Sequence, residues 1–130
     1  MKEVYDFLKK CGVFYLATID GDKPRVRPFG ALNIFEDKLY LQTGKVKNVS
    51  KQIEINNNVE VCGFTEGKWI RLEGKLIRDD RLEAKKDMLE NNPELKNMYS
   101  AEDDNTEVLY FESAKATINS FTEPPKEINF

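Results

Sequence analysis

Hydrophobic and polar positions alternate with the two-residue period of a β-strand in several segments of this chain. At residues 38–43, for example, Leu39 and Leu41 fall on one face and Tyr40 and Gln42 on the other. Strands bounded by turn residues are predicted at residues 13–19, 24–35, 38–43, 59–65, 68–78 and 106–121. Short strands joined mainly by tight turns predict an antiparallel sheet that is closed, or nearly closed, into a barrel.

Helical spacing of apolar residues interrupts the strand pattern. Val4, Phe7 and Leu8 predict a short helix at residues 3–10, which Gly12 ends. Further helices are predicted at residues 48–55 with Asn48 as N-cap, at 80–91 with Asp79 or Asp80 as cap, and briefly at 93–99. The tail from residue 122 is predicted to be irregular. We therefore expect one domain, residues 1–130, that is mostly β with flanking helices.

Composition and charge narrow the range of partners. Of the 130 residues, 40% are hydrophobic and 33% are charged, which is typical of a globular protein. The net charge is −3, whereas proteins that coat a polyphosphate backbone are normally basic, so nucleic acid is not an expected partner. No apolar run approaches the roughly 20 residues that cross a bilayer, and the N-terminus does not resemble a signal peptide. We expect a cytoplasmic protein without a membrane partner.

The reactive residue types exclude several kinds of catalysis. There is no histidine, which excludes Ser-His-Asp and Cys-His catalysis, histidine-ligated zinc and haem with an axial histidine. Cys11 and Cys62 are far apart in the sequence and have apolar neighbours, so we predict two reduced, buried thiols and no metal site. A bound cofactor is then the natural place for any redox chemistry.

A strand, a glycine and a helix start follow one another at residues 43–51. The N-terminus of a helix offers unpaired N–H groups and a partial positive charge to an anion. The hydroxyl of Thr43 can donate to a phosphate, and Lys47 and Lys51 lie one helical turn apart. The segment therefore predicts a phosphate site, with a capped helix carrying solvated lysines as the alternative.

Two other strands carry paired polar side chains. Alternation places Arg25 and Arg27 on one face and Val26 on the other, and Pro28 marks a strand edge where free backbone groups could bond a planar heterocycle. The alternative is an edge protected by charge and proline. Trp69 and Arg71 share a face of a later strand and could stack on an aromatic ligand or pair with an anion, or simply pack in the barrel or at an interface.

The order of these features is more specific than any one of them. A short helix is followed by "GVFYLATIDGDKPRVRPFG", "KLYLQTGKVKNVSKQIEINNNVEVCGF", "GKWIRLEGKLI", "ENNPELKNMY" and "EVLYFESAKATINSF". From residue 2 to residue 121 this order resembles the pyridoxamine 5′-phosphate oxidase-like family, the FMN-binding split barrels. The resemblance implies a six-stranded antiparallel split β-barrel that forms a homodimer, with FMN at the interface.

The resemblance also implies roles for individual residues. Carried over by position, the residues along the isoalloxazine ring and ribityl chain are Arg25, Val26, Arg27 and Pro28. Those at the phosphate are Thr43, Lys47, Asn48 and Lys51, and those that approach from the second subunit are Trp69 and Arg71.

We therefore expect an FMN-dependent oxidoreductase that passes electrons from a reduced carrier to a small molecule. The tail lacks the tryptophan and arginine of the substrate-binding stretch in enzymes that oxidise pyridoxamine phosphate, and the chain lacks the histidine of nitroimidazole-resistance proteins. A non-catalytic FMN carrier or redox sensor is one alternative. A β-barrel that binds another phosphorylated ligand or a protein is another, and deazaflavin or haem could replace FMN.

Overall fold

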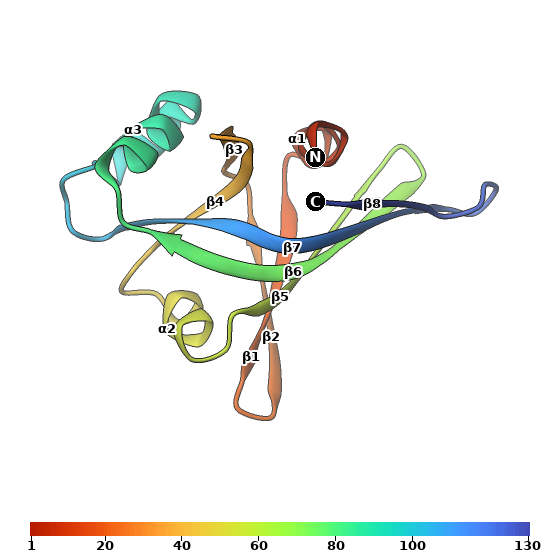
Figure 1. Ribbon diagram of the computed structural model, residues 1–130, viewed down its shortest axis with the longest axis horizontal. Helices are drawn as coiled ribbons and strands as arrows, with labels where there is room; N and C mark the ends of the chain where they lie inside the picture. The colour runs from red at the N-terminus through yellow and green to blue at the C-terminus, as the bar shows by residue number, and fades with distance from the viewer.

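Eight strands and three α-helices make up the computed structural model, which describes residues 1–130 (Figure 1). The strands are β1 (Phe14–Asp20), β2 (Lys23–Phe29), β3 (Leu32–Phe35), β4 (Lys38–Gly44), β5 (Asn58–Thr65), β6 (Lys68–Asp79), β7 (Thr106–Ser120) and β8 (Lys126–Asn129). The helices are α1 (Lys2–Cys11), α2 (Asn48–Ile55), α3 (Leu82–Asn91) and the 3₁₀ helix η1 (Pro93–Asn97). The predicted class, mostly β with flanking helices, is confirmed.

Tight hairpin turns set the register of neighbouring strands. Glu66 and Gly67, between β5 and β6, both have positive φ, at 52° and 76°. Glu36 and Asp37, between β3 and β4, have φ of 50° and 60°. Two consecutive residues with positive φ are the signature of a type I′ turn, whose twist matches that of the strands it joins. All strand pairs in the sheet are antiparallel, including those that no hairpin joins.

The order of the strands requires the sheet to curl. The hydrogen-bonded path runs β2-β1-β5-β6-β7-β4-β3, so its two end strands are consecutive in the chain. The ends of a flat seven-strand path would lie about 29 Å apart, whereas the link Gly30–Ala31 can span at most about 11 Å. No ladder joins β2 to β3. The sheet therefore forms a split barrel, as predicted. The single strand predicted at residues 24–35 is two strands, β2 and β3, separated by this link.

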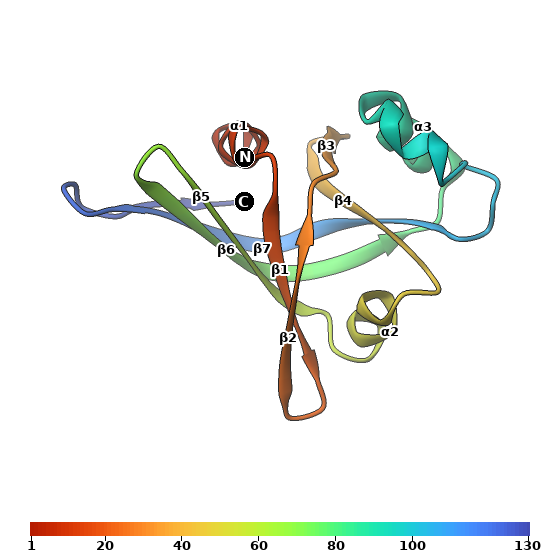
Figure 2. The same ribbon diagram turned by 180° about the vertical axis from the view of Figure 1, so that it is seen from behind.

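The two views show how the helices surround this sheet. Strands β6 and β7 run side by side across the molecule, and the β1–β2 hairpin extends beyond them with α2 beside it (Figures 1 and 2). Helix α1 lies against β5, and α3 lies against β3 and β7. The core under α1 and α2 contains Val4, Leu8, Val49 and Ile53 together with apolar residues of six strands. Lys47, rather than the predicted Asn48, is the N-cap of α2.

The C-terminal tail is ordered, so the prediction of an irregular tail was wrong for its last part. Strand β8 pairs with residues 115–118 of β7. The backbone N–H and C=O of Phe130 both bond to Ala114, at 2.9 and 2.7 Å. Ile128 and Phe130 pack against the core and supply the apolar contact that holds this strand in place.

The cysteines are less buried than predicted. Cys11, the last residue of α1, is half-buried, and Cys62 is exposed. Cys62 lies between the buried Val61 and Gly63 on β5, so strand alternation turns its side chain to the outward face of the sheet.

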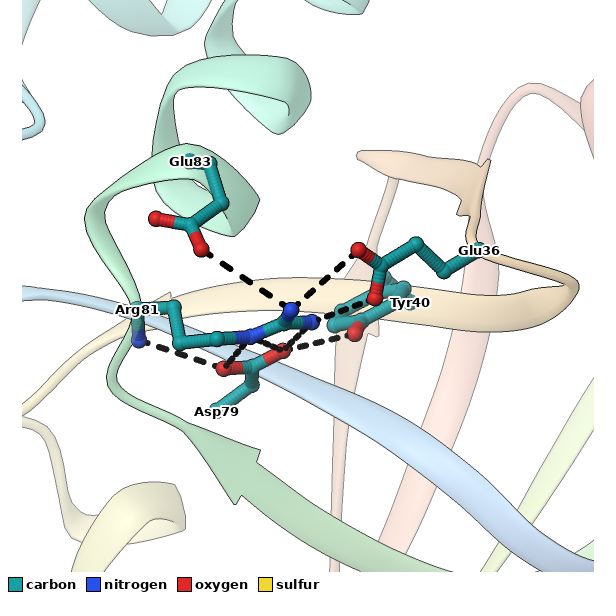
Figure 3. A network of polar contacts seen from close by, with 5 residues as sticks. All are labelled: Glu36, Tyr40, Asp79, Arg81 and Glu83. Carbon is teal, nitrogen blue, oxygen red and sulfur yellow. Dashed lines mark hydrogen bonds and ion pairs between the residues drawn. The ribbon is translucent and has the colours of Figure 1, made fainter.

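One polar network fastens helix α3 to the sheet (Figure 3). The guanidinium of Arg81 donates to both oxygens of Asp79 and of Glu36, at 2.8–3.3 Å. The buried hydroxyl of Tyr40 also donates to Asp79, at 2.7 Å. Arg81, rather than Asp79 or Asp80, is the N-cap of α3, and its backbone N–H bonds to Asp79 at 3.1 Å. The network thereby links β4, β6, α3 and the turn between β3 and β4.

Asp79 is ionised throughout the physiological range as a consequence of this network. Hydrogen bonds from the Arg81 guanidinium, followed by the one from Tyr40, lower the pKa of Asp79 to about 2 against the opposing effect of burial. Burial and the neighbouring carboxylate raise the pKa of Tyr40, which stays protonated.

We expect Asp79→Asn to lower the free energy of unfolding by roughly 1–2 kcal/mol near neutral pH. Because the folded-state pKa is depressed, this contribution is complete above about pH 5 and is lost as the pH falls toward about 2. Urea unfolding near pH 7 and near pH 3 should therefore show a smaller difference between wild type and variant at the lower pH. Asp80→Asn, at an exposed position, is the matched control and should change stability by less than about 0.5 kcal/mol. An equal loss at both pH values would contradict a role for the carboxylate charge.

Candidate functional site

A groove lies between the β1–β2 hairpin and helix α2. Its larger part is a cavity of about 660 Å³. The predicted site residues that line it are Arg25, Val26, Arg27, Lys47, Asn48 and Lys51. They come from two segments about 20 residues apart in the sequence, brought together because α2 packs on β1.

A second cavity of about 200 Å³ continues the first. The two share Arg27, Lys47 and Val49, and the second adds the predicted residues Pro28 and Thr43. Its remaining walls include the link after β2, Gln42 of β4, and Leu95, Met98 and Tyr99 from η1 and the residues after it. We refer to the two cavities together as the β2–α2 groove. It contains eight of the ten predicted site residues, six from the first cavity and two from the second.

The groove is strongly basic within an acidic protein. Four basic side chains line its larger part, those of Arg25, Arg27, Lys47 and Lys51, and Asp20 is the single carboxylate there. Arg25 is the only one of the four that forms an ion pair, with Asp20 at 3.0 Å. The second cavity has no acidic residue in its walls. This concentration of positive charge suits a ligand with a doubly charged anionic group.

The predicted facing of the β2 side chains is confirmed. Arg25 and Arg27 are opposite Thr18 and Leu16 of β1, on the side that faces α2. Val26 is opposite Ala17 on the outward face and is 69% exposed. β2 pairs only with β1, so its other edge leaves backbone groups free along the groove.

Arg27 is held in place by uncharged groups. One terminal nitrogen, Nη1, donates to Thr18 Oγ1 at 2.7 Å and to the carbonyl of Leu16 at 3.2 Å. The other, Nη2, donates to Gln52 Oε1 at 2.7 Å. Burial, and then repulsion from Arg25, lower the pKa of Arg27. Neither Thr18 nor Gln52 is among the site residues predicted from the sequence.

The turn before α2 uses its own backbone donors. Asn105, just before β7, accepts from Lys45 N through its carbonyl at 2.7 Å and from Val46 N through its side chain at 3.2 Å. Lys47 N bonds to the carbonyl of Gly44 at 3.0 Å. These three N–H groups are therefore not available to a ligand. Anion contacts must come from the basic side chains and from the start of α2, which refines the predicted phosphate site.

The position of Gly44, between a strand and a helix, suggests that glycine is needed there for a sharp turn, but its role is different. Its φ is not in the left-handed region, so the turn does not need glycine for its backbone conformation. A β-carbon at Gly44 would instead lie 3.1 Å from Asn105 Nδ2 and 3.2 Å from the hydroxyl of Tyr99. The missing side chain allows both groups to approach.

Trp69 and Arg71 lie outside the β2–α2 groove. Both are on β6, and Trp69 packs against Phe121 with ring centroids 5.1 Å apart. Arg71 lines a small polar cavity with Glu60 and Glu73. Both side chains belong to the outward face of the sheet, which we define by the exposed apolar residues Tyr15, Ile19, Val26 and Phe64 and their cross-strand neighbours.

Comparison with known proteins agrees with this architecture. A family model described as pyridoxamine 5′-phosphate oxidase matches residues 1–117. A NimC/NimA family protein from Clostridium acetobutylicum is 47% identical, with a TM-score of 0.98, over 100% of this chain and 92% of that one. No curated protein sequence matches the chain.

More distant structures share the fold alone. General stress protein 26 from Bacillus anthracis is 19% identical, with a TM-score of 0.78, over 99% of this chain and 97% of that one. A pyridoxamine 5′-phosphate oxidase-related, FMN-binding protein from Nostoc punctiforme is 12% identical, with a TM-score of 0.62, over 99% of this chain and 95% of that one.

We expect Gly44→Ala to destabilise the protein by about 1 kcal/mol, because Asn105 and Tyr99 must move apart to admit a methyl group. This loss corresponds to a fall of roughly 3–5 °C in the thermal midpoint for a chain of this length. Gly30→Ala is the matched control, because its β-carbon would meet only the Gly12 carbonyl, at 3.5 Å. Equal midpoints for the two variants would contradict the close approach at Gly44.

Proposed function

The chain belongs to the pyridoxamine 5′-phosphate oxidase family, and on that premise we propose that it binds FMN in the β2–α2 groove. We further propose that it passes electrons through this flavin from a reduced carrier to a small molecule. Bound there, FMN supplies hydride and single-electron transfer, which amino-acid side chains alone do not provide.

The observation that carries the proposal is the convergence of Arg25, Arg27, Lys47 and Lys51 on one cavity of a protein with a net charge of −3. A phosphate monoester is largely a dianion at neutral pH, and four cations with one carboxylate among them match it. Lys47 and Lys51 form no ion pair within the chain, so no protein carboxylate competes with the ligand for them.

The other end of the groove suits a flat, partly polar ring. Its walls combine apolar side chains of η1 and its surroundings with the polar side chains of Gln42 and Thr43. Pro28, in β2, has no backbone N–H, and the free edge of this strand offers the neighbouring N–H and carbonyl groups to a heterocycle. In this proposal Leu95 and Met98 restrict water at the ring end, while the basic end holds the phosphate.

A second copy of the chain is proposed to complete the site. The exposed apolar residues of the outward face include Ile19 and Val26, which also line the groove, so a subunit on this face would reach the ligand. Trp69 and Arg71 lie on the same face and in a homodimer would be presented to the partner's groove. Phe64, 63% exposed, and Tyr15, 50% exposed, supply apolar surface for such a contact.

We expect Lys47→Ala and Lys51→Ala each to raise the Kd for FMN about tenfold, since one charge-assisted contact to phosphate contributes about 1.4 kcal/mol. Flavin fluorescence titration measures both constants. Lys45→Ala is the matched control in the same turn, because Lys45 does not line the groove and lies 3.9 Å from Asp104. Failure of the wild-type protein to retain FMN absorbance after desalting would contradict the proposed function itself.

Electron transfer is tested separately from binding. FMN-loaded protein mixed with NADH or NADPH without oxygen should lose flavin absorbance faster than free FMN. The reason is that a donor admitted at the ring end of the groove would be held beside the flavin. Bleaching at the rate of free FMN with either donor would contradict turnover with nicotinamides and favour a non-catalytic FMN carrier or redox sensor.

A further inference from the structure

Arg27 lines both parts of the β2–α2 groove, and its guanidinium is fixed by three hydrogen bonds to uncharged acceptors. Two of the acceptors are side chains on other elements, Thr18 on β1 and Gln52 on α2. These two are also bonded to each other, since the Thr18 hydroxyl donates to Gln52 Oε1 at 2.6 Å. The three side chains therefore form a closed ring of hydrogen bonds that joins β1, β2 and α2.

The ring determines which part of the guanidinium stays free. Thr18 Oγ1 and Gln52 Oε1 lie 2.6 Å apart and accept from Nη1 and Nη2 respectively, so they occupy the tip of the planar fork. An arginine has five N–H groups, and three are used here, which leaves two. With the tip occupied, the two that remain are on Nε and Nη2, along one side of the fork. That side is a bidentate donor for a phosphate or a carboxylate.

The anchors leave the charge of Arg27 uncompensated. A carboxylate at either position would hold the guanidinium equally well but would cancel its charge. Thr18 is 3% exposed and is absent from the walls of the groove, so its contact with Arg27 is its evident link to the site. Burial and the nearby Arg25 both disfavour the charged form of Arg27, and the opposite charge of an anion bound beside it would offset them.

We propose that Thr18 and Gln52 are positioning residues that hold the free side of Arg27 ready for the phosphate, and so make the groove selective for phosphorylated over unphosphorylated flavin. This inference rests on the proposed function, because it assumes that a flavin occupies the groove. It concerns two residues that do not need to touch the reacting ring.

The test compares FMN with riboflavin, which has the same ring but no phosphate. Fluorescence titration of wild type and Thr18→Val gives the Kd for each. Thr18→Val keeps the shape of the side chain but removes the hydroxyl, and we expect the FMN Kd to rise about fivefold or more while the riboflavin Kd changes less than about twofold. A purely structural defect would weaken both flavins by the same factor.

A second variant keeps the test decisive if Thr18→Val does not fold. Gln52→Met keeps the length of the side chain and its helix propensity but removes the acceptor for Arg27 Nη2. We therefore expect folding to be preserved, the FMN Kd to rise about fivefold or more, and the riboflavin Kd to stay within about twofold. Glu54→Gln, at an exposed position of the same helix, is the matched control and should leave both constants within about twofold.

The outcomes distinguish this inference from the proposed function. A wild-type protein that binds FMN no more tightly than riboflavin would overturn the phosphate site and this inference with it. A wild-type preference for FMN that persists unchanged in Thr18→Val and Gln52→Met would leave the proposed function standing and overturn the role of these two residues. Equal weakening of both flavins in the variants would also overturn it.

Discussion

The curl of the sheet and the position of the β2–α2 groove depend on one topological constraint. This constraint is the two-residue link that joins the two end strands of the sheet. Because Gly30–Ala31 connects β2 directly to β3, the sheet must curl to bring these two end strands together at the link, yet they form no ladder. β2 is thus left with an unpaired edge inside an otherwise continuous sheet. Helix α2 follows β4 and packs on β1, so it lies beside the β1–β2 hairpin. The groove lies between that hairpin and α2, with the unpaired edge of β2 along it.

This constraint also concentrates charge. The protein as a whole is acidic, and most of its basic residues are dispersed on the surface. The curl brings Arg25 and Arg27, from one strand, against Lys47 and Lys51, from the turn and helix that follow the next hairpin. Four like charges in one cavity repel each other, and burial of Arg27 adds to the cost. Folding provides the free energy that holds them together, and a bound anion would lower that cost, which ties ligand affinity to the stability of the fold.

Most of the fold and eight residues of the groove could be predicted from the sequence, because both depend on local patterns and on their order. The arginine strand and the lysine turn are visible as motifs, and alternation correctly separates Val26 from its basic neighbours. Thr18, Gln52 and Asn105 could not be found in this way. Each is an ordinary polar residue whose role arises from contacts with residues 9 to 60 positions away.

Other differences have equally local causes. Residues 24–35 have a continuous strand pattern, but the pattern does not reveal that Gly30 and Ala31 lie at the point where the sheet changes edges. The final strand is too short to be recognised from two apolar residues, and it forms because β7 is long enough to offer a second partner edge. Asp79 looks like a helix cap from its position, yet it is drawn into the network around Arg81.

Two arginines in this structure fasten a helix to the sheet, and the difference between them is informative. Arg81 joins α3 to the sheet through the carboxylates of Asp79 and Glu36, which raise its pKa and balance its charge. Arg27 joins α2 to the sheet through an amide, a hydroxyl and a carbonyl, so its charge remains and part of its hydrogen-bonding capacity is unused. If the purpose of both were only to hold a helix, a carboxylate would serve at either site. A side chain that must hold a helix and also bind an anion needs neutral partners, because they leave its positive charge available. Arg27 has such partners.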